Sequence, residues 1–335
     1  MTLQKRNAWV LTSAAVVAAT LAGCERPPIE TTQNGNAGTG MYQVSNPRAV
    51  TPELEIPASM PPAPAAGPTA GEIYQNVQVL GDLSVAEFTR TMASITAWVS
   101  PEEGCNYCHN PQNLASDDVY TKVVSRRMME MTKSINANWS NHVKDVGVTC
   151  YTCHNGKPVP EHIWFATEEP NSQPFLGNRF GQNIASTEVG LQSLPEPFMK
   201  LLTVQDGPAI HIAGDGWEPG VSESNIKYSE YTMALMTHMS GALGVNCTYC
   251  HNTNNFASYE ESANGVIRMQ AKHGIEMVQY LNEDYLDPLG PVYPDYRLGP
   301  TGDAPKAYCT TCHGGLNKPL NGAVMAPEFP AFWSR

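Results

Sequence analysis

The chain has 335 residues, which is long enough for two domains, and its 20 Lys and Arg against 32 Asp and Glu give a formal charge of −12. This acidic balance argues against a nucleic acid as partner, because a phosphate backbone attracts basic surfaces. A basic protein is a plausible partner for a surface of this sign, although the acidity can equally serve solubility alone.

Residues 1–23 have the pattern of a bacterial secretory signal. Lys5 and Arg6 precede an apolar stretch at 8–22 that ends in small residues, and this stretch is too short and too rich in alanine for a permanent membrane span. The ending "LAGC" resembles a lipoprotein processing site, which predicts that Cys24 is the lipid-bearing first residue of the mature protein. A plain signal peptide and an uncleaved anchor are the alternatives, and in each case the chain is exported.

The next segment, 24–70, is rich in Pro, Gly, Asn and Thr and includes "MPPAPAAGP". A stretch of this composition cannot bury a core, so it predicts an extended tether between the lipid and the folded body. The body begins near residue 71.

Apolar residues at helical spacing predict four long amphipathic helices. Their expected ranges, in chain order, are 84–100, 116–139, 224–244 and 262–282. Between the second and third, the segment 163–218 has many Gly, Pro and Asn residues and reads as an irregular connector. Strand signals are sparse, so the expected class is mainly α with extensive ordered loops.

Eight of the nine cysteines lie in four C-x-x-C-H motifs, the attachment signature of c-type haem. The eight cysteines are Cys105, Cys108, Cys150, Cys153, Cys247, Cys250, Cys309 and Cys312. Two thiols this close can form thioethers to the two vinyl groups of one porphyrin, and the following histidine then lies under the iron as the proximal ligand. These histidines are His109, His154, His251 and His313.

Zinc sites and disulfides are the alternative explanation of these cysteines. Zinc motifs pair two half-sites at regular spacing, whereas the motifs here are separated by 45, 97 and 62 residues. No cysteine of the body remains for an ordinary disulfide framework. We therefore expect four haems, numbered 1 to 4 in motif order.

An internal repeat groups the motifs into two pairs. The segments "CNYCHNPQNLASDDVYTKVVSRRMMEM" and "CTYCHNTNNFASYEESANGVIRMQAKH" align without gaps at an offset of 142 residues. Each copy is followed by a second motif. The sequence therefore predicts two pseudo-symmetric halves, 71–162 and 219–335, with two haems each.

A sixth ligand from the protein makes a haem an electron carrier, and methionine gives a higher potential than a second histidine. Met92 and Met236 lie at corresponding places on the helices that precede haems 1 and 3. Met233 and Met239 share the helix face of Met236 and leave that choice open. For haem 2 the candidates are Met128, Met129 and Met131.

Haem 4 is expected to differ. The residue that corresponds to Met128 in the second copy is Gln270, so another side chain must complete the iron's coordination. The candidates are Met269, His273, Met277 and His142.

The chain resembles the tetrahaem cytochrome subunit of purple-bacterial photosynthetic reaction centres over nearly its whole length. The resemblance rests on "LAGC", the four motifs as two pairs, "SRRMMEMT", "NWSNHV" and "GVTCYTCHNG". It implies one axial pair for each haem. These pairs are Met92 with His109, Met128 with His154, Met236 with His251, and His142 with His313.

The resemblance also implies function and partners. Such a subunit caps the periplasmic face of the reaction-centre core subunits and re-reduces the photo-oxidised bacteriochlorophyll pair, with haem 3 nearest that pair, then haems 4, 2 and 1. The electrons would come from a soluble cytochrome c2-like protein or a high-potential iron–sulfur protein. Glu102 and Glu103, with Asp117 and Asp118 nearby, suggest an acidic docking rim beside haem 1, or simply a solvated loop.

Two other classes remain to be weighed. A multihaem reductase needs an open iron position, whereas every haem here has a candidate sixth ligand. A tetrahaem storage protein with two histidines on each iron would need histidines where methionines stand. The expectation is an electron-transfer protein and not an enzyme.

Overall fold

The computed structural model describes part of the chain in detail. The described residues are 30–33, 42–45, 56–166, 189, 194, 199, 201–202, 226–252, 255–256, 258–259 and 265–333. The predicted signal peptide and Cys24 lie outside the described residues, as does most of the predicted tether and connector.

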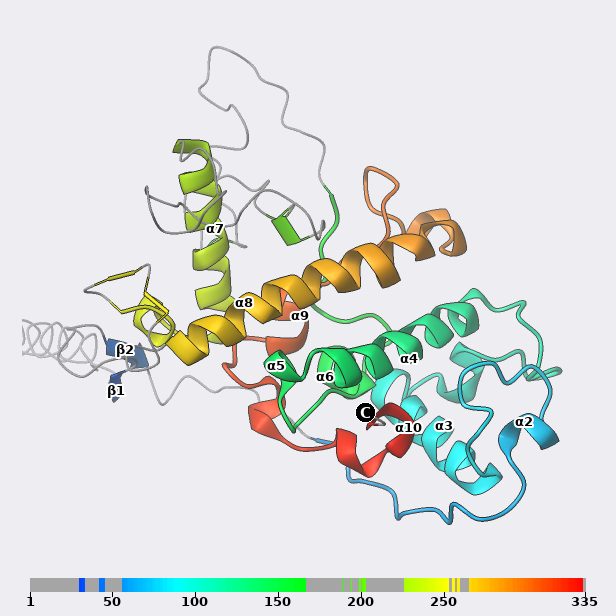
Figure 1. Ribbon diagram of the computed structural model, residues 1–335. Helices are drawn as coiled ribbons and strands as arrows, with labels where there is room; N and C mark the ends of the chain where they lie inside the picture. Colours follow the sequence, from blue (N-terminus) through cyan, green and yellow to red (C-terminus); the bar gives the residue numbers. More distant parts are fainter. Residues whose placement is uncertain are drawn as a thin grey trace, which may run out of the picture.

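The described fold is mainly helical, as the sequence predicts (Figure 1). Its four long helices are α3 (Val85–Val99), α4 (Tyr120–Asn138), α7 (Ile226–Leu243) and α8 (Gly265–Tyr280). Each lies within a few residues of its expected range. In the described part of the chain no helix is both long and apolar enough to cross a membrane.

Shorter elements connect this frame. The short α-helices are α2 (Ala70–Ile73), α5 (Ser140–Val143), α6 (Cys150–His154), α9 (Cys309–His313) and α10 (Pro330–Trp333). The 3-10 turns are η1 (Gly104–Tyr107), η5 (Cys247–Tyr249), η8 (Asp287–Val292), η9 (Asp295–Arg297), η10 (Pro319–Gly322) and η11 (Ala326–Glu328), and η7 (Leu281–Leu286) is a π-helical continuation of α8. Two short strands, β1 (Glu30–Gln33) and β2 (Tyr42–Ser45), pair antiparallel with Glu30 opposite Ser45.

Helix α3 begins at a capping box. The Ser84 hydroxyl accepts the Glu87 amide at 3.1 Å, and the Glu87 carboxylate accepts the Ser84 amide at 3.3 Å. Two of the otherwise unpaired amides at the start of a helix are thereby satisfied. The serine hydroxyl also donates to the carbonyl of Pro64 at 2.7 Å, so the cap holds the preceding segment as well.

The first hydrophobic cluster joins distant parts of the chain. Leu80, Trp98, Met129 and Tyr151 come from the first half, and they pack with residues from the end of the chain. The latter are Leu320, Phe329, Ala331 and Phe332. Figure 1 shows α10 against α4, with the C-terminus beside them. The C-terminal residues were assigned by sequence to the second half, yet they pack with the first.

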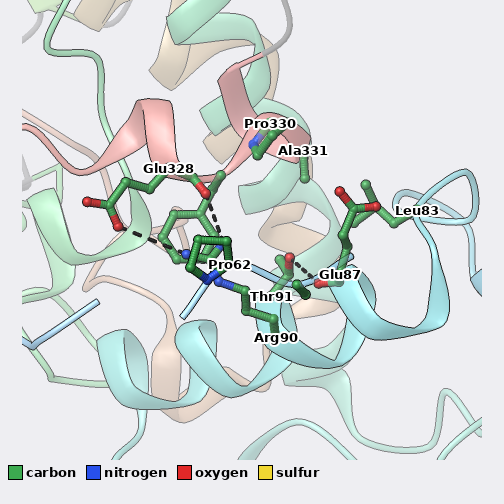
Figure 2. Close-up of a pocket in the computed structure, with 10 residues that line it drawn as sticks. Pro62, Leu83, Glu87, Arg90, Thr91, Glu328, Pro330 and Ala331 are labelled. Carbon is green, nitrogen blue, oxygen red and sulfur yellow. Dashed lines mark hydrogen bonds and ion pairs between the residues drawn. The ribbon is translucent and has the colours of Figure 1, made fainter. Parts of the chain in front are cut away.

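Arg90 of α3 binds this C-terminal segment to the first part of the chain (Figure 2). Its guanidinium donates to the carbonyl of Glu328 at 2.8 Å and to the carbonyl of Met60 at 3.0 Å, and it lies 4.1 Å from the ring centre of Phe329. A cavity of about 110 Å³ lies beside Arg90 between α3 and this segment. No residue of a C-x-x-C-H motif lines that cavity.

A second cluster builds the core around α7. Ala234, Leu235, Val278 and Tyr308 pack there with four buried residues of the predicted connector. The connector residues are Val189, Met199, Leu201 and Leu202. A third, smaller cluster spans α4 and α8 and so joins the two halves; it comprises Ile135, Val148, Met277 and Leu281.

Candidate haem-attachment sites

The four C-x-x-C-H motifs adopt two local conformations. The motifs at 105 and 247 form the 3-10 turns η1 and η5, and each turn ends at a cysteine, Cys108 or Cys250, with φ −108° and ψ −24°. The motifs at 150 and 309 form the single α-turns α6 and α9, which end at left-handed Asn155 and Gly314. The first motifs of the two sequence repeats therefore share one conformation, and the second motifs share the other.

Each proximal histidine is oriented by a hydrogen bond from Nδ1 to a backbone carbonyl. The pairs are His109 with Leu114 at 3.0 Å, His251 with Phe256 at 2.9 Å, His154 with Lys157 at 2.9 Å and His313 with Leu316 at 2.8 Å. A carbonyl can only accept, so Nδ1 carries the proton and Nε2 keeps its lone pair. Metal-binding histidines are held in this way, and the four rings therefore fit axial coordination of an iron through Nε2.

Burial favours the neutral form of three of these rings. It lowers the pKa of His154 and of His251, and it lowers the pKa of His313 to about 4. Neutral imidazole is the form that binds a metal, so these histidines are ready to coordinate at neutral pH.

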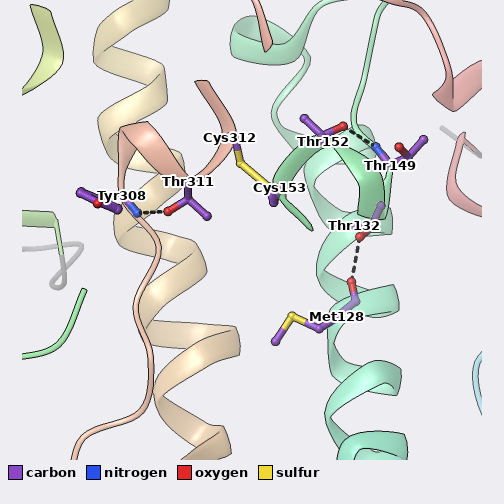
Figure 3. Close-up of a disulfide and its surroundings, with 8 residues drawn as sticks. All are labelled: Met128, Thr132, Thr149, Thr152, Cys153, Tyr308, Thr311 and Cys312. Carbon is purple, nitrogen blue, oxygen red and sulfur yellow. Dashed lines mark hydrogen bonds between the residues drawn. A yellow bond between two sulfur atoms is a disulfide. The ribbon is translucent and has the colours of Figure 1, made fainter. Parts of the chain in front are cut away.

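The motif cysteines include one pair that the sequence did not lead us to expect. Cys153 and Cys312 form a disulfide, with their Cα atoms 4.4 Å apart, where α6 and α9 meet (Figure 3). The other six motif cysteines are free thiols, and burial raises the pKa of Cys150 and Cys309 to about 12. A sulfur in a disulfide cannot also form a thioether, so haem attachment at Cys153 and Cys312 requires this bond to be open.

His142 lies opposite the proximal histidine of the fourth motif. The ring centres of His142 and His313 are 6.0 Å apart, and the ring planes are inclined by 68°. Two metal–nitrogen bonds of about 2 Å each, plus the distance of each ring centre from its own nitrogen, separate two axial imidazoles by roughly 6 Å. The pair is thus spaced as ligands of one iron would be.

Helix α8 holds His142 in this position. Nδ1 of His142 donates to the carbonyl of Gln270 at 2.9 Å, and the Gln270 side chain donates back to the carbonyl of His142 at 2.7 Å. Gly274 leaves room for the ring, since a Cβ at that position would lie 2.5 Å from Cε1 of His142. Gln270 is the residue that replaces methionine in the repeat, and here it positions His142, one of the candidate ligands.

The remaining candidates for haem 4 have other contacts. His273 bonds to Glu276 at 3.0 Å, Met277 is buried in the third cluster, and Met269 is 36% exposed. The structure therefore favours His142 among the four residues that sequence reasoning left open.

Packing also separates the methionines of α4. Met129 belongs to the first cluster and Met131 packs against the third, whereas Met128 belongs to neither. Figure 3 shows the Met128 side chain projecting from α4 below the disulfide, one turn from Thr132. Met128 is therefore the methionine of this helix that core packing does not use.

Packing distinguishes less clearly among the candidate methionines for haems 1 and 3. Met92 packs at the edge of the first cluster. Met236 and Met239 both pack against the second cluster, and Met233 is 58% exposed. The choice of Met236 over Met239 stays a prediction.

Two asparagines that sequence reasoning missed hold the approach to the second motif of each half. Asn136 is fully buried, accepts the Val148 amide at 2.8 Å and donates to the carbonyls of Val148 and Phe332. Asn282, also fully buried, accepts the Ala307 amide at 2.8 Å. In both cases the amide lies two residues before the first motif cysteine. Asn136 lies in "KSINAN" and Asn282 in "LNEDYL", where other polar residues surround them, so the sequence pattern does not single them out.

The acidic residues of the predicted docking rim differ in how their charges are paired. Glu102 and Glu103 are exposed, and Glu103 accepts the Ser100 hydroxyl at 2.8 Å. Asp117 is exposed as well, and its carboxylate is paired with two nitrogens of Arg126 at 2.8 and 2.9 Å and with Lys122 at 3.2 Å. These cations offset its charge, and a docking rim that includes Asp117 stays a prediction.

Comparison with known proteins shows which family the chain resembles. Residues 25–333 match the family model described as photosynthetic reaction centre cytochrome C subunit. The chain is 51% identical to the photosynthetic reaction center cytochrome c subunit of Rubrivivax gelatinosus, over 96% of this chain and 88% of the relative. It is 46% identical to the protein of that name from Thermochromatium tepidum, over 95% of this chain and 78% of the relative. Cytochrome c-554 of Chloroflexus aurantiacus is 24% identical over 73% of this chain and 69% of the relative.

Proposed function

The chain belongs to the family of photosynthetic reaction centre cytochrome c subunits, and from this we propose that it carries electrons through four covalently attached haems to the photo-oxidised bacteriochlorophyll pair. Members of this family are electron-transfer proteins and not enzymes, which decides against a multihaem reductase. They carry covalently bound haem c and associate with the reaction-centre core at the photosynthetic membrane.

The arrangement in two pseudo-symmetric halves is part of the proposal. In support, Nδ1 of the proximal histidine bonds to the carbonyl five residues later in both first motifs. In both second motifs it bonds to the carbonyl three residues later. Cys153 and Cys312 occupy corresponding places in α6 and α9 and touch each other, as residues on a two-fold axis between the halves would. The halves are 71–162 and 219–335, joined by 163–218, with the C-terminal residues packed back onto the first.

We assign each haem its ligands from the sequence. When bound, a haem supplies an iron that changes between the ferrous and ferric states. The two cysteines of each motif hold the porphyrin, and the proximal histidine binds the iron through Nε2. Met92, Met128, Met236 and His142 complete the coordination of haems 1, 2, 3 and 4. The proposal for haem 4 rests on the distance between the rings of His142 and His313, which fits two ligands of one iron. These two ligands come from different halves.

Replacement of His142 tests this assignment. Methionine raises a haem potential relative to histidine, so a redox titration of His142→Met should show one of four midpoints raised and the other three unchanged. The matched control is His273→Met, which changes a rejected candidate and should leave all four midpoints unmoved. If His142→Met also left all four unmoved, the assignment would be wrong.

Contact between α6 and α9 supports an order of the haems along the molecule. The second motifs of the two halves meet, so haems 2 and 4 are neighbours in the middle, with haems 1 and 3 at the ends. We propose that electrons enter at haem 1 from a soluble cytochrome c2-like or high-potential iron–sulfur donor and leave from haem 3.

We further propose that the protein lies on the periplasmic face, tethered through lipid on Cys24 and the segment 24–70, after removal of 1–23. Mass spectrometry of the mature N-terminus distinguishes a diacylated cysteine from a free or uncleaved one.

The deciding experiment is flash-induced absorbance in the haem α-band of native membranes with the haems reduced beforehand. Haem oxidation after a single flash, faster than a diffusing donor allows, is the expected result. Absence of light-driven oxidation would refute direct re-reduction of the photochemical pair by this chain.

A further inference from the structure

The backbone carbonyl that orients the proximal histidine of haem 1 has a second donor. The carbonyl oxygen of Leu114 accepts Nδ1–H of His109 at 3.0 Å and the ammonium of Lys122 at 2.8 Å. A carbonyl oxygen has two lone pairs, so both are engaged. The Lys122 ammonium therefore shares its acceptor with the histidine proposed to bind the iron of haem 1.

Lys122 is held in an unusual place for a lysine. Its side chain is 8% exposed, and the ammonium also donates to the carbonyl of Ser116 at 2.7 Å. It stands in the first turn of α4, where a cation opposes the helix dipole. Burial and helix position both disfavour a lysine here, and the two carbonyls and Asp117 offset that cost.

The negative charge of Asp117 opposes the positive charge of Lys122. Its carboxylate contacts Lys122 at 3.2 Å and the two Arg126 nitrogens, and hydrogen bonds from Arg126 hold its pKa well below the usual range. It therefore remains ionised at neutral pH. At an offset of 142 residues, Lys122 corresponds to Asn264 and Asp117 to Tyr259, whose ring lies 3.9 Å from the Arg268 guanidinium.

We propose that Lys122 and Asp117 are opposing positioning residues that set the reduction potential of haem 1 through His109. The proposal rests on the ligand assignment of haem 1 given above. Hydrogen bonding to a ligating histidine increases its donor strength, and an ammonium on the same acceptor weakens that bond. Lys122 therefore destabilises the ferric state by charge and through His109, which raises the potential, and Asp117 lowers it.

On this inference, haems 1 and 3 have the same types of iron ligand, but their reduction potentials are set differently. Haems 1 and 3 share His/Met ligation in the proposed scheme, yet the charged pair is present only in the sequence of the first copy. The potential of the haem at the electron-entry end can thus be adjusted without any change of iron ligand.

The test is a redox titration of the full holoprotein in two variants. In Lys122→Met one of the four midpoints should fall, and in Asp117→Asn the same midpoint should rise, with the other three unchanged. Loosening of the haem pocket admits water and would shift the midpoint in the same direction in both variants, so opposite signs separate charge from structural damage. Lys122→Arg, which keeps the charge, should lie closer to the parent protein than Lys122→Met.

Lys318→Met is the matched control. Lys318 also follows a haem motif, but the residue is exposed, and the carbonyl that orients His313 belongs to Leu316. Its removal should leave every midpoint unchanged. Shifts of the same sign in Lys122→Met and Asp117→Asn, or no shift in either, would overturn the inference. If Lys122→Met fails to fold, an unmoved set of midpoints in Asp117→Asn overturns it alone.

The two levels of failure are distinguishable. If the parent protein contained fewer than four haems, the proposed function would fail. If four midpoints were present and the variants moved none of them, only the roles of Lys122 and Asp117 would fail.

Discussion

Single side chains that bond to the main chain decide where the proposed haem ligands lie. Asn136 and Asn282 hold the chain two residues before a motif, and Gln270 holds His142 by two hydrogen bonds. The motif cysteines and histidines could be predicted because their spacing is itself the chemical requirement. The two asparagines could not, because their partners are main-chain groups that only the folded chain brings near.

Asn136→Ala should destabilise the protein markedly. The change leaves the Val148 amide and two carbonyls buried without their present partner, at a cost of about 3 kcal/mol. The apparent midpoint of urea unfolding should therefore fall. Asn138→Ala is the control, since Asn138 lies on the exposed surface of the same helix and bonds to Ser134; an equal loss in both variants would contradict the role given to Asn136.

Gly274→Ala should displace His142 from haem 4. A Cβ at 274 would lie 2.5 Å from the ring, and the ring would have to move. We expect the ferrous protein to bind carbon monoxide at one haem, measured by a difference spectrum. Gly241→Ala is the control, because a Cβ there meets nothing within 4 Å. Equal carbon monoxide binding by both variants would count against steric placement of His142 by α8.

Helices place the methionines and carry the motifs, and here sequence pattern was most informative. The apolar period located α3 and the other long helices within a few residues. The π-turn η7 and the 3-10 turns that follow it were not foreseen, because they result from packing of the chain around Leu281 and Leu289 in the interior.

Ser84→Ala should weaken α3. Loss of the cap costs about 1 kcal/mol, and the lost bond to Pro64 adds to it. Because α3 carries Met92, we expect the haem 1 midpoint to become heterogeneous before the other three change on mild heating. Thr89→Ala, which removes an exposed hydroxyl from the same helix, serves as comparison. If Ser84→Ala behaved like Thr89→Ala, the cap would not control this end of the helix.

The whole molecule is acidic, yet its acidic groups are not equivalent. All three are exposed, but Asp117 is paired with Arg126 and Lys122, whereas Glu102 and Glu103 lie near the first motif without such a pair of cations. Total charge could be read from the sequence, but the pairing of individual charges could not. A docking surface for a basic donor is therefore best tested at Glu102 and Glu103.

Charge reversal tests that surface. Glu102→Lys with Glu103→Lys should lower the second-order rate of reduction by a basic soluble cytochrome severalfold at low ionic strength, and the difference should shrink as salt is added. The comparison variant is Glu283→Lys, which changes an exposed acid in η7. Unchanged rate and salt dependence would exclude docking at Glu102 and Glu103.

The packing of the last residues against the first cluster has a consequence for the order of events during synthesis. A chain leaves the ribosome from its N-terminus, so α3, α4 and the first two motifs emerge early, while Leu320, Phe329 and Phe332 come last. The half that is made first must wait for the end of the chain before its interior can close. A premature stop near residue 318 would therefore damage the beginning of the protein more than the region next to the stop.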